Sequence, residues 1–278
     1  MTPQKESRMA KKRVVVISDM HCGHLVGLTP PGWQLQPAGD DEVYAHRRAK
    51  WAAIQRECWT WYVRKITSLR PIHLLLVVGD AIDGKGERSG GTELLTSDRH
   101  EQVDIALKCI QQAKAKHTEM VYGTPYHTGV QEDWENDVAS TLGCPIGSHG
   151  WAEVNGVCFD YKHFLAASSI PHGRATPLLK EDLWNALWAE HEDQPRADII
   201  LRAHVHYHLH VGGVRKGRKW KAMSLPSLQA MGTKYGGRKC SGHVDYGLVW
   251  FDVDSNGRWS WEAEIPEIKS QRAAATKY

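Results

Sequence analysis

Short apolar runs alternate with longer stretches of helical periodicity along the first 201 residues. The runs are rich in β-branched residues, as strands buried on both faces require, and they predict strands over 13–18, 72–78, 119–122, 156–161 and 197–201. The intervening stretches predict helices from Asp40 or Asp41 to Leu69, from Asp98 to about Lys116, over 133–142, and from Thr176 to about Glu192. Alternation of strand and helix indicates an α/β fold.

The last quarter of the chain has a different pattern. After residue 201, turns separate predicted strands at 219–224, 246–253 and 258–264. A run of strands that follows strand–helix alternation predicts a mixed sheet layer. We expect one domain over 1–278, with the core of the site at 14–206 and a strand-rich, basic part at 207–278.

The composition is that of an ordinary globular protein, with 41% hydrophobic and 24% charged residues. No apolar run approaches the roughly 18–20 residues of a membrane span, so we expect no membrane association. The first residues lack the apolar stretch of a signal peptide, which predicts a cytoplasmic protein. The six cysteines form no CxxC pair and are interpreted as reduced thiols.

The net charge of +3 is too small to indicate a nucleic-acid partner by itself, but the charge is unevenly distributed. From residue 211 onward there are 12 Lys and Arg against 6 Asp and Glu. The densest basic stretch comprises Arg215, Lys216, Arg218, Lys219 and Lys221. Two interpretations stay open: a solvated hairpin, or a surface that contacts phosphate groups of a nucleotide or nucleic acid.

Each of the five predicted strands of the α/β part runs directly into Asp or His. The residues at the strand ends are Asp19 and His21, Asp80 and Asp83, His127, His163, and His204 with His206. Chemistry in α/β folds gathers beyond the carboxyl ends of the strands, so we expect these side chains to converge at one edge of one sheet. Carboxylates and imidazoles together suit two divalent transition-metal ions, with Mn²⁺ favoured and Fe, Zn, Co or Ni as alternatives.

The order of these blocks resembles the signature of the calcineurin-like metallophosphoesterase superfamily, DxH, GDxxD, GNH, H and GHxH. The matching residues here are Asp19-Met20-His21, Gly79-Asp80-Ala81-Ile82-Asp83, the isolated His163, and Ala203-His204-Val205-His206, with Ala203 in place of Gly. The likeness extends from Val14 to His206. It implies an α/β fold of the calcineurin-like type, a four-layer β-sandwich of mixed sheets flanked by helices.

The resemblance also implies a set of metal ligands. Asp19, His21 and His206 would hold the first ion, His163 and His204 would hold the second, and Asp80 would bridge both. His172 is the alternative to His163 as the metal ligand of the fourth block.

The third block departs from the family pattern. Where the family has Gly-Asn-His, this chain has Gly123-Thr124-Pro125-Tyr126-His127. Two interpretations compete. Either His127 takes the place of the general acid and Thr124 helps to complete the site, or the second metal site is weak and His127 is only a loop residue.

The activity that the resemblance implies is hydrolysis of a phosphate ester by attack of a metal-bridging hydroxide. We expect a phosphodiesterase that acts on nucleotides or nucleic acid, with His127 as the proton donor and with Thr124 and Arg174 contacting substrate. A phosphomonoesterase and a catalytically impaired metal-binding scaffold are the alternatives. The build resembles phosphoesterases of phages and bacteria. His24 and His208 are further candidates to line the site.

Overall fold

The computed structural model describes residues 11–36, 42–129, 133–168, 170–231, 242–273 and 275. Asp40 and Asp41, which the sequence offers as caps of the first helix, lie outside these residues, as does Cys240. Within them, no helix combines the length and apolarity that a membrane crossing needs. The five described cysteines are free thiols, and four have a pKa that burial raises.

The first sheet has six strands in the order β11-β10-β1-β2-β3-β4. Their bounds are β1 Lys12–Ile17, β2 Leu74–Val78, β3 His117–Val121, β4 Ile146–Gly147, β10 Leu248–Val253 and β11 Trp259–Glu264. The strands β1 to β4 are parallel, and β10 and β11 extend the sheet in antiparallel fashion. All five residues of β2 are buried, because helices cover one face of the sheet and a second sheet covers the other.

The second sheet has five strands in the order β5-β6-β7-β9-β8. Their bounds are β5 Gly150–Val154, β6 Val157–Lys162, β7 Ile199–Arg202, β8 Leu209–Arg215 and β9 Arg218–Ser224. The strands β6, β7 and β9 are parallel to one another, and β5 and β8 are antiparallel edge strands. Both sheets are therefore mixed.

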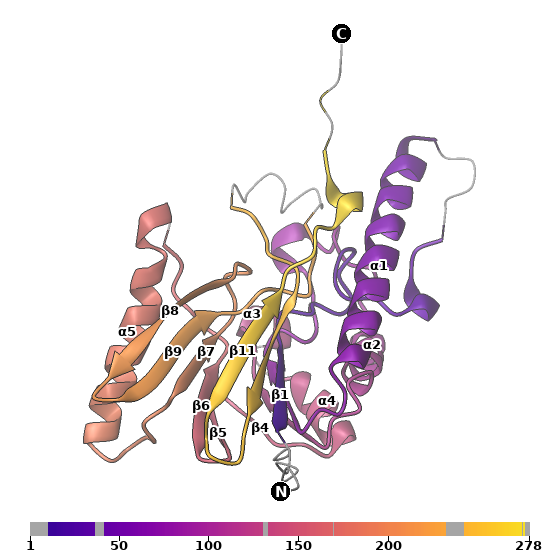
Figure 1. The fold of residues 1–278 in the computed structure, drawn as a ribbon. Coiled ribbons are helices and arrows are strands. Elements are labelled where there is room, and N and C mark those ends of the chain that lie inside the picture. The colour runs from indigo at the N-terminus through magenta and orange to yellow at the C-terminus, as the bar shows by residue number, and fades with distance from the viewer. Residues whose placement is uncertain are drawn as a thin grey trace, which may run out of the picture.

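Helices cover the outer faces of the two sheets (Figure 1). Their bounds are α1 Glu42–Ser68, α2 Arg99–Gln111, α3 Pro125–Thr128, α4 Glu135–Leu142 and α5 Ala175–Glu190. Short 3-10 turns lie at 31–33, 87–89, 171–173 and 269–271. The helices α1, α2 and α4 pack on the first sheet, whereas α5 packs on β8 and β9 of the second.

Three apolar cores separate the four layers. One fills the space between the first sheet and its helices, a second lies between the two sheets, and a smaller one lies under α5. Phe159 of β6 meets Phe251 of β10 edge to face across the middle core. The predicted calcineurin-like architecture of two mixed sheets flanked by helices is confirmed.

Two predicted helix boundaries are wrong. The helix α2 begins as expected, because Asp98 accepts hydrogen bonds from the backbone N–H groups of His100 and Glu101, but it ends at Gln111 rather than Lys116. Lys114 has a φ of 49°, a left-handed conformation that an α-helix does not continue through. The helix α5 begins at Ala175, because Arg174 already has helical angles as it leaves the preceding 3-10 turn.

The prediction that the strand ends share one edge of one sheet is also wrong. The strands β1, β2 and β3 belong to the first sheet, and β6 and β7 belong to the second. The carboxyl ends of both sets nevertheless meet at the same end of the sandwich, because their Asp and His side chains come within ligand distance of one another. The site is therefore built across the gap between two sheets.

Candidate metal centre

The backbone turns sharply where it presents the candidate ligands. Five of the six have positive φ, between 44° and 72°. They are Asp19, His21, Asp80, His204 and His206. Left-handed conformations are uncommon for residues other than glycine, although Asp and His adopt them more readily than most, and such strain gathers at functional sites. The strands β1, β2 and β7 therefore end in turns that point their Asp or His side chains toward the neighbouring strand ends.

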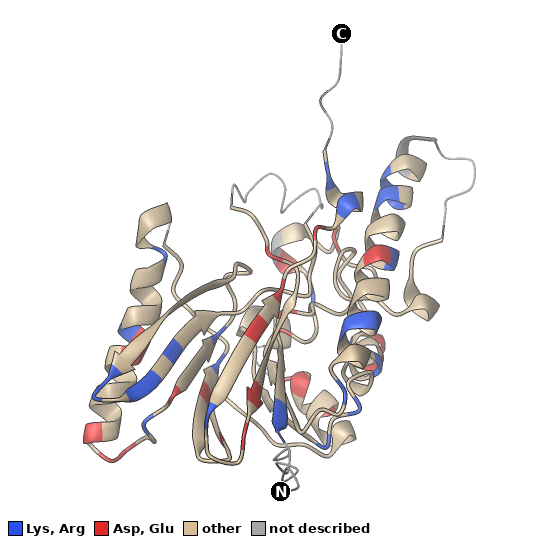
Figure 2. Ribbon diagram, in the orientation of Figure 1, with Lys and Arg blue, Asp and Glu red and all other residues tan. Residues whose placement is uncertain are grey.

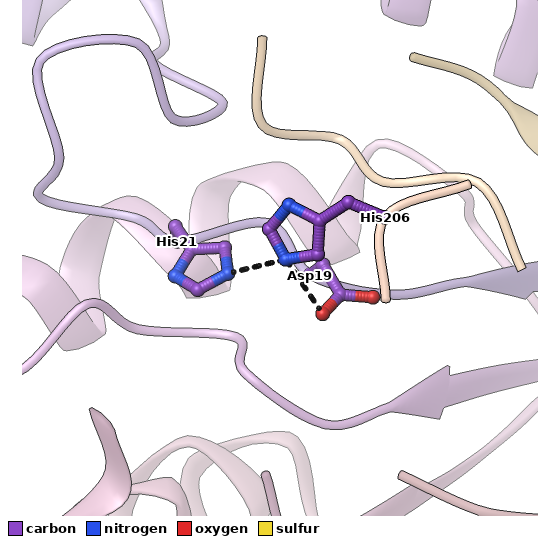
Figure 3. A group of neighbouring side chains, drawn as sticks. All are labelled: Asp19, His21 and His206. Carbon is purple, nitrogen blue, oxygen red and sulfur yellow. Dashed lines mark hydrogen bonds and ion pairs between the residues drawn. The ribbon is translucent and has the colours of Figure 1, made fainter. Parts of the chain in front are cut away.

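The first group of side chains contains Asp19, His21 and His206 (Figure 3). The Nε2 atom of His206 lies 3.2 Å from Oδ1 of Asp19 and 3.3 Å from Nε2 of His21. Asp19 and His21 are buried after β1, and His206 reaches them from the loop after β7. One carboxylate oxygen and two imidazole nitrogens thus converge on one point, as the resemblance implies.

The second group contains Asp80, His163 and His204. The Nε2 atom of His163 lies 3.0 Å from Oδ2 of Asp80, and the same Oδ2 atom lies 4.0 Å from Nε2 of His21 in the first group. The two groups therefore adjoin, with Asp80 facing both. This is the arrangement that a carboxylate shared by two cations needs.

Buried polar atoms at the centre lack hydrogen-bond partners among the described residues. Both carboxylate oxygens of Asp19 are in this state. Buried polar groups without partners cost free energy, and they are rare unless a ligand or ion satisfies them. Oxygen and imidazole lone pairs that point into one buried space fit a divalent transition-metal cation.

Burial and nearby charges shift the pKa values of two histidines of the site in opposite directions. Burial, together with the nearby His127, lowers the pKa of His21 to about 4, so its imidazole is neutral and free to act as a ligand at neutral pH. For His163, burial is outweighed by the carboxylates of Asp80 and Asp19, which raise its pKa to about 10. A cation bound by His163 would have to displace a proton from this imidazole.

Asp83 orients two histidines. Its Oδ1 atom lies 3.0 Å from Nδ1 of His21 and 3.4 Å from Nδ1 of His127, and its backbone oxygen lies 2.8 Å from the same His127 nitrogen. These three residues also form a compact group that could hold an ion. Because Nε2 of His21 already faces Asp19 and His206, its Nδ1 atom is left for Asp83, as in carboxylate–histidine–metal arrangements.

His127 lies on α3, beside the first group. Its ring meets that of His21 edge to face, with centroids 4.5 Å apart. Burial lowers its pKa, but the hydrogen bond to Asp83 and the charges of Asp80 and Asp83 outweigh burial and raise the pKa to about 9. The shifted histidine of the third block is therefore held at the site rather than displaced into a distant loop.

Thr124 contacts the candidate bridging carboxylate. Its backbone N–H donates to Oδ1 of Asp80 at 2.7 Å, and its hydroxyl lies 3.2 Å from the same oxygen. Gly123 allows this approach, since a Cβ there would lie 2.0 Å from Oδ1 of Asp80. Thr124 lines a cavity beside His163, separate from the one that contains His127 and Arg174.

Glu135 is a site residue that the sequence analysis missed. It is buried in the first turn of α4 and accepts hydrogen bonds from the backbone N–H groups of Ala81 and Gly123, both at 2.7 Å. One carboxylate thus joins the loops after β2 and β3 around Asp80. Burial and the charge of Asp80 raise its pKa to about 7. A Glu in a first helical turn is common, so the sequence carried no signal of this role.

A cavity with a volume of about 530 Å³ opens on the first group, within the range of small-molecule sites. His24, His127, Arg174 and Tyr207 are among the residues that line it. The Arg174 guanidinium lies 4.7 Å from the Tyr207 ring centroid. Both Nε of Arg174 and the Tyr207 hydroxyl are buried without a hydrogen-bond partner among the described residues.

The other candidate histidines are less central. His172 is exposed in the 3-10 turn at 171–173 and joins none of the described ligand groups, whereas His163 does. His24 is buried and lies 3.6 Å from Glu93. Residues 204–210 do not extend as one strand, because His204 and His206 have left-handed angles and β8 begins only at Leu209. Nδ1 of His208 lies 2.9 Å from the Ser224 carbonyl oxygen.

The basic stretch lies on β8 and β9 (Figure 2), and most of its side chains contact other residues of the protein. Arg215 pairs with Asp182, and Arg218 pairs with Asp198. Lys219 and Lys221 lie over the rings of Trp259 and Trp261 on the other sheet. These contacts hold the two sheets and α5 together, which favours the structural interpretation of this stretch over a phosphate-contact surface.

Comparison of the sequence with family models and with curated proteins finds no relative. No family model matches the chain, and no curated protein matches it. Among solved structures, the chain is similar to zinc-bound Vps29 from Entamoeba histolytica, with 13% identity and a TM-score of 0.38 over 91% of this chain and 98% of that one.

Two further structures show a similar degree of likeness. An archaeal phosphodiesterase has 10% identity and a TM-score of 0.38, covering 91% of this chain and 99% of its own. A metallophosphoesterase from Sphaerobacter thermophilus has 9% identity and a TM-score of 0.38, covering 93% and 91%. Likeness at this level carries no functional argument, which rests instead on the residues and geometry of this chain. That geometry consists of two mixed sheets flanked by helices, with Asp and His side chains of both sheets gathered at one end of the sandwich.

Replacing Glu135 should weaken metal binding without removing any candidate ligand. In Glu135→Ala, the loops that carry Asp80 and Gly123 lose their common acceptor, and we expect affinity for added Mn²⁺ to fall about 10–100-fold, as for other residues that orient ligands. Isothermal titration calorimetry measures the change. Asp137→Ala, an exposed position on the same helix, is the matched control. Equal affinity in the two variants would contradict the orienting role.

Proposed function

We propose that this protein is a binuclear-metal-dependent phosphoesterase that prefers phosphodiesters. The observation that carries the proposal is the pair of adjoining ligand groups, Asp19, His21 and His206 beside Asp80, His163 and His204, with unpartnered lone pairs between them. The first group opens on a cavity large enough for a nucleotide-sized substrate. A purely structural cluster would need neither the open cavity nor the unsatisfied atoms.

Two divalent ions held in these groups would supply positive charge to the phosphate oxygens and lower the pKa of a water molecule. Manganese is the ion that we favour. The protein's own contribution is the position of the ligands, and Asp83, Glu135 and Thr124 fix that position through hydrogen bonds to His21, to the loop backbone and to Asp80.

His127 is the proposed proton donor. Its Nδ1 atom donates to the backbone oxygen of Asp83, so the proton that can be transferred is on Nε2. In the imidazolium form, Nε2–H gives its proton to the departing ester oxygen, and the ring becomes neutral while Nδ1 stays bonded to Asp83. Proton donation matters most for a poor leaving group, such as the hydroxyl of a nucleoside, and this favours a diester substrate.

Arg174 is the proposed contact for a substrate phosphate. A guanidinium pairs two oxygens at once, and Nε of Arg174 has no partner among the described residues. The stacked ring of Tyr207 holds the guanidinium on the wall of the cavity that contains His127. A nucleotide or a nucleic-acid end is the substrate class that we favour, because one phosphate could reach the candidate ligands while a second phosphate of the same substrate meets Arg174.

One observation favours a second candidate, a metal-binding scaffold with impaired turnover. Both donors of Thr124 are directed at Asp80, and its hydroxyl oxygen is a poorer neutral ligand than the amide oxygen of the family's Asn. A weak second site would leave an ion in the first group alone. A phosphomonoesterase is the third alternative. A monoester with an activated leaving group has little need of a proton from His127, so it could be hydrolysed even if proton donation is weak.

Elemental analysis tests the metal centre. We expect two transition-metal ions per chain in the wild type after incubation with Mn²⁺ and removal of excess metal. Asp80→Asn should lose most of both, because the shared carboxylate charge disappears from the two groups. Asp104→Asn on the exposed face of α2 is the control and should retain both ions. One ion in the wild type would favour the scaffold.

Removing His127 should separate substrates by their leaving groups. For His127→Ala we expect hydrolysis of a dinucleotide to fall about 10²–10⁴-fold, the usual effect of a general acid, while hydrolysis of an activated nitrophenyl monoester changes far less. Steady-state kinetics with both substrates measures the difference. His46→Ala, at an exposed position on α1, is the control. Equal losses on both substrates would contradict proton donation.

The pH dependence of diester hydrolysis should have a basic limb that belongs to His127. The acid form of His127 is required, so kcat should fall as pH rises through its pKa, which is about 9 in the protein alone. Bound cations repel the imidazolium and move the limb to lower pH. The limb should be absent in His127→Ala, and a limb that persists in this variant would assign it to another group.

A further inference from the structure

The helix α5 has its polar and apolar faces reversed relative to a surface helix of a globular protein. The side chains that it buries against the second sheet are Leu178, Asp182 and Asn185. Asp182 pairs with Arg196 at 3.1 Å and with Arg215, and the side chain of Asn185 accepts a hydrogen bond from Arg196 at 2.7 Å. An amphipathic helix normally turns its apolar stripe inward and its charges outward.

The outward face of α5 is apolar. The exposed fractions of its five large apolar residues lie between 44% and 56%; they are Leu179, Leu183, Trp184, Leu187 and Trp188. In Figure 1, α5 lies at the outer side of the molecule, beside β8 and β9, and in Figure 2 charged residues occupy only short parts of the helix. Large contiguous apolar patches on a protein surface mark interaction sites.

We propose that this face of α5 pairs with the same face of a second copy of the chain, with the two helices antiparallel. A twofold axis that passes between Leu183 and Trp184 places Leu183 opposite the partner's Trp184. It also places Leu179 opposite the partner's Trp188. The spacing of the apolar residues is thus self-complementary, which an isologous interface requires. Lys180 would lie opposite the partner's Leu187 and cover it with its aliphatic stem.

Charge favours the antiparallel arrangement. The C-terminal end of α5 and the turn after it carry the exposed Glu190, Glu192 and Asp193. An antiparallel pair places these carboxylates beside the partner's helix N-terminus, whose dipole end is positive. A parallel pair would bring the acidic ends together. The same acidic residues disfavour an anionic membrane surface or a nucleic acid as the occupant, since both would be repelled.

The size of the patch fits a dimer. Five large side chains at about half exposure amount to roughly 500 Å² of apolar surface on each copy. A standard interface buries roughly 800 Å² per partner, and the polar rim of α5 supplies much of the difference. The two tryptophans lie within the stripe, and Trp is the residue type most enriched among those that dominate binding energy.

Analytical ultracentrifugation of the full chain across a concentration series tests the proposal. We expect a dimer for the wild type and, for the double variant Leu183→Glu with Trp184→Glu, a dissociation constant raised roughly 30-fold or more. Val214→Glu places the same charge on an exposed apolar residue of β8 and should leave the dimer unchanged. Circular dichroism spectra of all three proteins show whether the fold is retained.

Oxidative crosslinking provides a second measurement that does not depend on weakening the interface. Leu183→Cys lies beside the proposed axis and should form a covalent dimer, whereas Val214→Cys and the wild type should not. A wild type that stays monomeric at high concentration, or a dimer that survives the charged double variant, would overturn the proposal. A monomer that cosediments with phosphatidylcholine vesicles would assign the face to a membrane surface instead.

Discussion

The burial of two carboxylates at one end of the sandwich is the constraint on which the rest of the site depends. Asp19 and Asp80 are both almost fully enclosed, and both oxygens of Asp19 have no hydrogen-bond partner among the described residues. Isolated buried carboxylates are costly, so the surroundings must supply positive charge. The histidines around them do so in part, and a pair of cations would do so more fully. The strained turns, the close glycine and the orienting Asp83 are all means of keeping these groups in place.

Much of this arrangement could be predicted from the sequence, because its signals are local and strong. The apolar runs that become β1, β2, β6 and β7 are continuous and end directly in Asp or His, so strand position and ligand position were predicted by the same pattern. The structure brings together all six candidate ligands, and His127 beside them. Their metal-binding and catalytic roles stay predictions.

Other features depend on contacts between distant residues and gave no local signal. The edge strands β4, β5 and β8 were not predicted, since β4 has only two residues and β8 contains two adjacent glycines. The division of the strands between two sheets is not written in their periodicity, because a strand buried on both faces has the same pattern in either sheet. Glu135 lies 54 residues from the amide that it accepts at Ala81, and only the folded chain brings them together.

The division of the ligands between the sheets has a mechanical consequence. Asp19, His21 and Asp80 come from the first sheet, whereas His163, His204 and His206 come from the second. A cation bound by the first group would therefore be held by residues that follow strands of both sheets, and so would one bound by the second group. Such a cation would crosslink the two sheets. By thermodynamic linkage, the affinity of the protein for the cation would then depend on how well the two sheets pack. A substitution in the apolar core between the sheets would therefore change the affinity for the cation, although the substituted residue lies far from the ligands.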